Sequence, residues 1–359
     1  SVAIGYETLK AQNFTSATNV YNTAVGFHAG NDVTTGVQNT LIGGLAGDAQ
    51  TTADNNTAVG YIALSANTTG GANTAVGQGA LSANTTASNN TAFGRSALLS
   101  NTTGDTLTAV GVNALATNTT AANNTAVGVN ALYLTTTGAS NTAMGKDALK
   151  TNTTGAENTA IGALSLDACT TGNNNTAMGH NSLSTNILSD HNVAIGNDAL
   201  ATHNTGSSID AYNVAVGSGA GFAVTTGKQN TFIGGNAGDA NTTADNNTAV
   251  GYNSLTANTT GASNVAVGAN ALDANTTANS NTAIGADSMS ANTTGGDNVA
   301  VGKNALLVNT TGGSNTAVGV LALDANTTAS NNTAVGHSAL SANTTGHSNV
   351  AVGTESLKS

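Results

Sequence analysis

The chain has 359 residues, of which only 7% are charged and 3% aromatic, and it contains no Pro and no Trp. A globular enzyme of this size carries about 25% charged residues and a bulkier core, so the composition argues against that class. The net charge of −11 comes from few groups, and it argues against nucleic acid, whose binding requires clustered Lys and Arg. The sequence has no run of about 18 apolar residues, so no membrane insertion by this segment is predicted.

The sequence is built from a 17-residue repeat. Asn56–Ala72 begins with Asn-Thr-Ala-Val-Gly, and the same motif returns 17 residues later. With this Asn as position 1, there are 21 repeat starts, 17 residues apart except for two 21-residue units that begin at Ser1 and Asn192. Residues 39–61 reappear almost unchanged at 230–252. We therefore predict a first block at 1–191 and a second, truncated copy at 192–359, joined in one continuous rod.

The ends of the sequence suggest processing. The chain starts with Ser1, and it stops eleven residues into a repeat. It is therefore expected to be a piece of a longer protein.

Within each unit the predicted elements follow in a fixed order. Position 2 is Thr or Val and position 4 is apolar in all 21 units, which predicts a strand, as at residues 57–59. Position 5 is always Gly and begins a turn. Positions 8–13, as at residues 63–68, read Ala-Leu-x-Ala-Asn-Thr, and alternation predicts a second strand with its Leu inward. Positions 15–17 are small or polar and form a second turn.

These elements are too short to bury a core within one unit. The units must stack, with parallel ladder hydrogen bonds between them and apolar positions in continuous columns. Asn at position 1, present in 19 of the 21 units, would stack its amide groups along the axis. The predicted fold is all-β, a parallel β-solenoid (β-roll) of about 21 coils with two strands in each. A helical fold is rejected because β-branched residues and Gly recur too often. Disorder is rejected because an apolar residue keeps the same repeat position in all units.

A volume exchange indicates which side chains point inward. Where Leu at position 9 is replaced by Gly47 or Gly238, Ala at position 3 is replaced by Leu41 or Phe232. Positions 3 and 9 should therefore share one interior, and position 4 should point outward. A soluble monomer rarely exposes such a long apolar stripe, so we predict a homo-oligomer with the position-4 column at its interface. The column includes Val25, Val59, Val76, Val110, Val127, Val250, Val267, Val301, Val318 and Val335.

The motifs "SVAIG" at Ser1–Gly5 and "NVAIG" at Asn192–Gly196 resemble the head repeats of trimeric autotransporter adhesins. Those heads are left-handed parallel β-rolls packed three around an axis. The longer form, Asn-Thr-Ala-Val-Gly-x-x-Ala-Leu-x-x-Asn-Thr-Thr-Gly, is similar to arrays in phage tail fibres and bacterial surface proteins. The resemblance implies a homotrimeric, extracellular and non-enzymatic fibre segment, on a virion tail or a bacterial cell surface, that serves host or surface attachment.

Receptor contact is predicted where the repeat is broken. The two 21-residue units each add four residues at one turn, within Ala11–Tyr21 and Ala201–Tyr212. Phe14, Tyr21, His203 and Tyr212 would then lie on protruding loops, where a cell-surface glycan or another receptor could stack on aromatic rings. The alternative is that these loops only mark the junctions between blocks.

Other chemistry finds little support in the sequence. The six His residues do not converge at metal-ligand spacing. The glycine-rich run Val216–Gly221 lies in phase with the repeat, so no nucleotide cofactor is predicted. Asp54, Asp245 and Asp297 are interpreted as solvated turn acids rather than calcium ligands. No catalytic residue, cofactor or metal is therefore predicted. Two alternatives to a fibre are kept, namely an ice-binding β-solenoid and a glycan-degrading solenoid enzyme.

Overall fold

The computed structural model describes residues 1–16 and 18–358. The chain divides into two compact units, Ser1–Asn175 (unit 1) and Thr176–Ser359 (unit 2). Each unit is all-β, and no helix occurs among the described residues. This division follows spatial contacts, whereas the predicted division at residues 191 and 192 follows the duplicated sequence.

Unit 1 contains ten three-residue strands in its described part. They are β1 (Val2–Ile4), β2 (Thr23–Val25), β3 (Thr40–Ile42), β4 (Thr57–Val59), β5 (Thr74–Val76), β6 (Thr91–Phe93), β7 (Thr108–Val110), β8 (Thr125–Val127), β9 (Thr142–Met144) and β10 (Thr159–Ile161).

Unit 2 contains eleven strands of the same length among its described residues. They are β11 (Thr176–Met178), β12 (Val193–Ile195), β13 (Val214–Val216), β14 (Thr231–Ile233), β15 (Thr248–Val250), β16 (Val265–Val267), β17 (Thr282–Ile284), β18 (Val299–Val301), β19 (Thr316–Val318), β20 (Thr333–Val335) and β21 (Val350–Val352).

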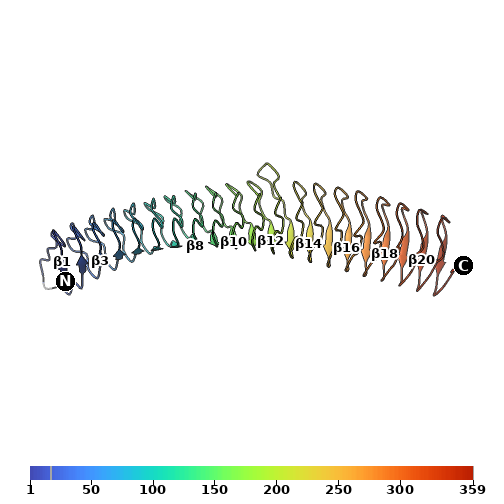
Figure 1. Cartoon of the computed structure of the whole chain (residues 1–359), viewed down its shortest axis with the longest axis horizontal. Coiled ribbons are helices and arrows are strands. Elements are labelled where there is room, and N and C mark those ends of the chain that lie inside the picture. Colours follow the sequence, from blue (N-terminus) through green and yellow to red (C-terminus); the bar gives the residue numbers. More distant parts are fainter. Residues whose placement is uncertain (17, 359) are drawn as a thin grey trace. The chain divides into compact units, whose positions relative to one another are not determined.

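Within each unit, every strand pairs in parallel with the strand of the next coil, and equivalent repeat positions lie opposite one another. In β4 and β5, for example, Ala58 pairs with Ala75 and Val59 with Val76. Figure 1 shows this as one arrow in each coil. The predicted parallel β-solenoid with a 17-residue coil is confirmed.

The predicted second strand is wrong, because each coil has only one strand among its described residues. Residues at positions 6–11 form turns, and positions 7 and 9 have left-handed backbones, as at Ile62 (φ 53) and Leu64 (φ 54). The left-handed Leu turns two adjacent side chains, Ala63 and Leu64, into the interior, and both are fully buried. A strand cannot do this, since its neighbouring side chains point to opposite faces. The backbone still bonds to the next coil, since Leu64 N–H donates to the Ala80 carbonyl at 2.9 Å.

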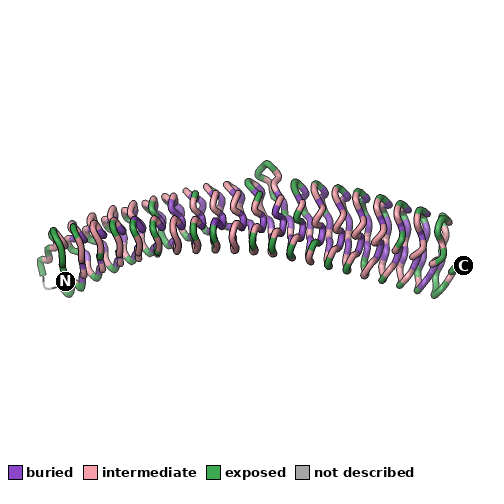
Figure 2. The backbone as a smooth tube through the Cα atoms, in the orientation of Figure 1, coloured by how far each residue is buried: buried purple, intermediate pink, exposed green. Residues whose placement is uncertain are grey.

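The interior of each coil is formed by small and medium apolar side chains. In the coil that starts at Asn56, the Ala58, Ala63 and Leu64 side chains are fully buried, and they occupy positions 3, 8 and 9. Figure 2 shows buried stretches of backbone at matching places in successive coils. The predicted shared interior of positions 3 and 9 is therefore confirmed.

Buried Asn side chains fix the turns to one another. Asn56 Nδ2 donates to the Gly70 carbonyl at 3.0 Å, and Asn56 Oδ1 accepts from the backbone N–H of Asn73 in the next coil at 2.9 Å. A second ladder occurs at position 12, where Asn84 Nδ2 donates to Asn67 Oδ1 at 3.0 Å. Because a buried polar group without a partner is costly, these ladders fix the register of the coils.

The invariant glycine at position 5 is needed for a close approach between coils. Gly60 has a φ of 141°, and a Cβ there would lie 2.5 Å from the carbonyl oxygen of Gly77 in the next coil. Residues with a side chain rarely adopt this φ, and the neighbouring backbone leaves no room for a Cβ atom.

Bulky residues at position 3 are matched by glycines in two coils. A Cβ on Gly47 would lie 2.8 Å from Leu41 Cδ2, and a Cβ on Gly30, in the preceding coil, would lie 2.7 Å from Leu41 Cδ1. In unit 2, Phe232 fills the space left by Gly221 and Gly238 in the same way. Gly221, the last residue of the glycine-rich run Val216–Gly221, therefore serves core packing.

Candidate functional site

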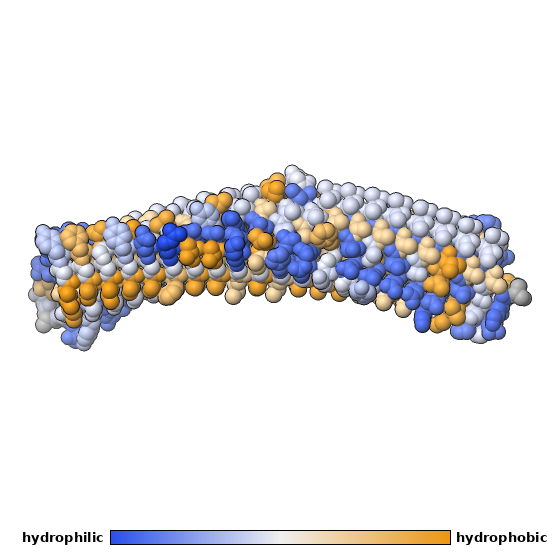
Figure 3. All heavy atoms as spheres, viewed as in Figure 1, coloured by the Kyte–Doolittle hydropathy of each residue, from blue (hydrophilic) through white to orange (hydrophobic). Residues whose placement is uncertain are grey.

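The position-4 side chains lie on the outer face of the strands. In most strands the residue at position 3 is buried while positions 2 and 4 are half-buried, as in β15 and β16. Larger residues in the column are more exposed, including Ile42 in unit 1 and Ile233 in unit 2. Figure 3 shows apolar residues in rows that run from coil to coil, with hydrophilic residues between them. The outward direction of the column is confirmed, while its role as an oligomer interface stays a prediction.

The four-residue insertion of unit 2 forms a loop that protrudes between β12 and β13 (Figure 1). Its tip, Gly206–Ser208, is exposed. The placement of His203 on this protruding loop is wrong, because the side chain is fully buried. His203 occupies position 12, whose Asn points inward in most coils, and the insertion begins only after it.

Burial keeps His203 neutral. Neither ring nitrogen has a hydrogen-bond partner, and loss of solvation lowers the pKa of the imidazole to about 4. His203 is thus a residue of the core and unavailable for receptor contact.

A polar cluster stands at the base of this loop. Asp210 Oδ1 lies 2.9 Å from His191 Nδ1, and the Tyr212 hydroxyl donates to Asp210 Oδ2 at 3.2 Å. The rings of His191 and Tyr212 are 5.1 Å apart and tilted by 31°. All three side chains are exposed, and Asp210 raises the pKa of Tyr212 through its charge and its hydrogen bond. Tyr212 therefore lies on the surface as predicted, with two partners that the sequence analysis missed.

The insertion in unit 1 is less prominent as a contact surface. Tyr21 is exposed, whereas Phe14 is half-buried. Ala17, which belongs to the same predicted loop, lies outside the described residues. Among the predicted contact residues, the structure thus presents Tyr21 and Tyr212 most openly, each in its own unit.

A second group of aromatic residues was not predicted. Tyr6 and Phe27, at position 6 of adjacent coils, have ring centroids 5.5 Å apart with planes 12° apart. The His28 ring stacks on Phe27 at 4.1 Å. The signal was present in the sequence, because residues in the same phase of successive coils must lie next to each other in a solenoid.

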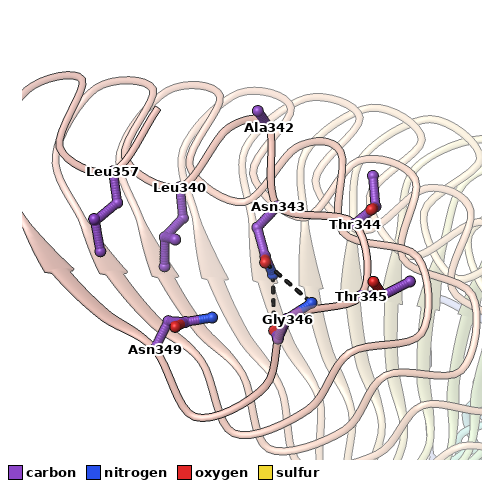
Figure 4. A pocket seen from close by; sticks show the side chains of 8 residues that line it. All are labelled: Leu340, Ala342, Asn343, Thr344, Thr345, Gly346, Asn349 and Leu357. Atoms are coloured by element: carbon purple, nitrogen blue, oxygen red, sulfur yellow. Dashed lines mark hydrogen bonds between the residues drawn. The ribbon is translucent and has the colours of Figure 1, made fainter. Parts of the chain in front are cut away.

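The last coil of unit 2 contains a cavity of about 320 Å3, shown in Figure 4. Leu340 and Leu357 supply apolar surface, and Asn343 exchanges hydrogen bonds with Gly346 at 3.0 and 3.1 Å. The equivalent residues one coil earlier, Leu323 and Asn326, are fully buried. The cavity is therefore the interior cross-section of the solenoid seen at its last coil, rather than a separate site.

Two of the three turn acids have a structural role, whereas Asp297 is exposed. Asp54 Oδ1 accepts from the backbone N–H of Val37 at 2.7 Å, and Asp245 does the same for Lys228 at 2.7 Å. They are thus less free than solvated turn acids. Over residues 1–16 and 18–358, no group of three or more His, Cys, Asp or Glu side chains is placed to hold a metal ion. Within the same residues, no helix is long and apolar enough to cross a membrane.

No protein-family model matches the chain, and no curated protein matches it.

Proposed function

We propose that the chain is a non-enzymatic structural segment of an extracellular fibre, in a phage tail fibre or a bacterial surface adhesin, and that it assembles as a homotrimer. The observation that carries the proposal is the position-4 column. In each unit it gives the outer strand face an uninterrupted series of apolar side chains in parallel register. Burial of such a series against two identical copies would remove apolar surface from water.

The interior supports a structural role as well. Coil-to-coil contact depends on backbone ladders, Asn ladders and close glycine packing, all of which repeat in both units. Such an interior makes a stiff scaffold. Attachment to a host or a surface would use the exposed residues at the repeat breaks, among which Tyr212 with His191 and Asp210 is the best formed.

The trimer is tested with Val250→Asp combined with Val267→Asp. Because each Asp would bury an unpaired charge at the interface, we expect trimers to dissociate or misfold. Sedimentation equilibrium measures the mass. The matched control is Thr260→Asp with Thr277→Asp, at exposed turn positions of the same coils. A monomeric parent protein, or an unchanged mass for the Val variant, would reject the interface.

Ice binding is a second candidate, and one observation favours it. All nine strands from β2 to β10 begin with Thr, so a regular Thr ladder lies on the outer face of unit 1 beside the position-4 column. A thermal-hysteresis assay tests it. Ice binding predicts thermal hysteresis in the parent protein, and the double variant Thr108→Tyr, Thr125→Tyr should abolish it. The absence of thermal hysteresis in the parent would exclude ice binding.

A further inference from the structure

The first two coils of unit 1 expose aromatic rings that the fold does not require. Tyr6 and Phe27 are 65% and 55% exposed although they stack on each other. The duplicated sequence gives an internal control, because Asn197, Ser218 and Gly219 replace Tyr6, Phe27 and His28 there. The strands β12 and β13 of that copy pair in the same register as β1 and β2. The aromatic group therefore calls for an explanation outside the solenoid itself.

Gly44 leaves space beside the Phe27 ring. Gly44 holds position 6 in the coil after Phe27, and Tyr61 holds it in the coil after that. A Cβ on Gly44 would meet only Tyr61 ring carbons, at 3.5 and 3.9 Å, and its φ lies outside the left-handed range. The backbone thus does not need glycine at this point, and a side chain there would contact the Tyr61 ring on one side only.

The spacing of the coils suits a small ring between two aromatic side chains. Phe27 and Tyr61 are two coils apart, so their backbones are about 10 Å apart. A sugar ring placed between two aromatic rings makes one contact with each, and two such contacts at the usual carbon–carbon separation need about 7–8 Å. One saturated six-membered ring could therefore lie over Gly44 with the Phe27 ring on one side and the Tyr61 ring on the other.

Polar groups border the rings. Lys10 Nζ lies 2.7 Å from Glu7 Oε1, and His28 Nε2 lies 3.2 Å from Glu7 Oε2. The hydrogen bond from Lys10 lowers the pKa of the Glu7 carboxyl, so it stays ionised. Beside the aromatic faces there are thus a carboxylate that accepts hydrogen bonds and an ammonium that donates them.

We propose that Tyr6, Phe27, His28 and Tyr61, with Gly44 between them, form a saccharide-binding surface on unit 1. A pyranose ring has an apolar C–H face and hydroxyls at its edge, so it fits aromatic faces bordered by Glu7 and Lys10. One sugar ring stacks on Phe27 over Gly44, and Glu7 and Lys10, about two coils away beside Tyr6, bond to the hydroxyls of a neighbouring sugar unit of the same oligosaccharide. The proposal rests on the attachment function above and adds the class of ligand.

The test measures binding of the full chain to a panel of oligosaccharides, with calorimetry on those that bind. The variant Tyr6→Asn, Phe27→Ser, His28→Gly takes its residues from the second copy, and we expect affinity to fall about tenfold or more. Gly44→Leu should also abolish binding, because it fills the open position while keeping the rings. Gly235→Leu and Tyr252→Ser are the matched controls in unit 2, and they should bind as the parent does.

Three results would overturn the proposal. The first is that the parent binds no saccharide of the panel at millimolar concentration. The second is that the triple variant binds as well as the parent. The third is that the triple variant has a different assembly mass in the absence of sugar. The last would make the rings a protein contact. Sedimentation of the same samples separates the two hypotheses. If the parent is a trimer that binds no sugar, saccharide binding is rejected and the fibre proposal stands. If the parent is a monomer that binds sugar, the fibre proposal is rejected and saccharide binding stands.

Discussion

Leu41 in unit 1 and Phe232 in unit 2 are equivalent residues of the duplicated sequence, and each fills a space left by two glycines. The surface of the two preceding coils differs, because Tyr6 and Phe27 in the first copy correspond to Asn197 and Ser218 in the second. Within each copy, the bulky residue and its two glycines depart from the common repeat together, since packed cores tolerate neither voids nor excess volume. The exposed residues differ between the copies while the strand register stays the same. The difference teaches that function in this repeat must be sought outside the core.

The largest effect should come from emptying the interior. Phe232→Ala should lower the free energy of unfolding of unit 2 by about 3–5 kcal/mol, because Gly221 and Gly238 leave the cavity open. Adding Gly221→Leu and Gly238→Leu rebuilds the common repeat and should restore most of the loss. Chemical denaturation measures both. If the triple variant were as unstable as Phe232→Ala, the three positions would not share one space.

The next largest effect concerns glycines at two positions of the repeat, position 5 and position 6. Gly60→Ala in unit 1 and Gly251→Ala in unit 2 combine a left-handed φ with a clash against the next coil. Each should cost about 2–4 kcal/mol. Gly44→Ala and Gly235→Ala, at position 6 of the preceding coils, should cost less than about 0.5 kcal/mol. Thermal unfolding of the four variants checks this, and equal losses at position 5 and position 6 would refute the close approach.

His203 should make unit 2 sensitive to acid. Its pKa is about 4 in the folded state, below the ordinary value of 6.5, so the unfolded chain takes up the proton first. Stability should therefore fall by about 2 kcal/mol between pH 7 and pH 5. His203→Gln introduces the residue of the first copy, Gln12, and should remove this loss. The difference between parent and variant isolates His203 from carboxyls such as Asp239, whose pKa is raised by burial. Parallel pH profiles would show that the imidazole does not titrate this way.

The smallest effect is expected on the surface. Tyr6→Asn with Phe27→Ser removes one exposed ring stack and should change the free energy of unfolding of unit 1 by about 1 kcal/mol or less. Urea titration measures it. A loss of several kcal/mol would mean that the rings support the fold, contrary to what the second copy indicates.

Much of the fold could be predicted because each position of the 17-residue repeat has the same physical role in every coil. The strand at positions 2–4, the shared interior of positions 3 and 9, and the Asn ladder all followed from residue type and spacing. The second strand did not, since Leu64 has a left-handed backbone that Leu disfavours, and stacking of the coils overrides that preference.

The candidate site was only partly predictable. His203 was misplaced because the insertion was read as beginning before it, although counting from Asn192 gives position 12 and hence an inward side chain. Tyr212 was found from its place at the end of the insertion. His191 and Asp210 were missed because 19 residues separate them, so they do not share one phase of the repeat, although their side chains lie 2.9 Å apart.

The strict parallel register within each unit has a consequence for heredity. Each coil presents to its successor the same donors and acceptors that its predecessor presents to it, as the pairs Asn56–Asn73 and Asn73–Asn90 show. Gain or loss of 17 codons by unequal recombination would therefore leave the backbone and Asn ladders matched. Such a gene can vary the reach of its product in whole coils, while a slip of one or two codons would break the ladder at once.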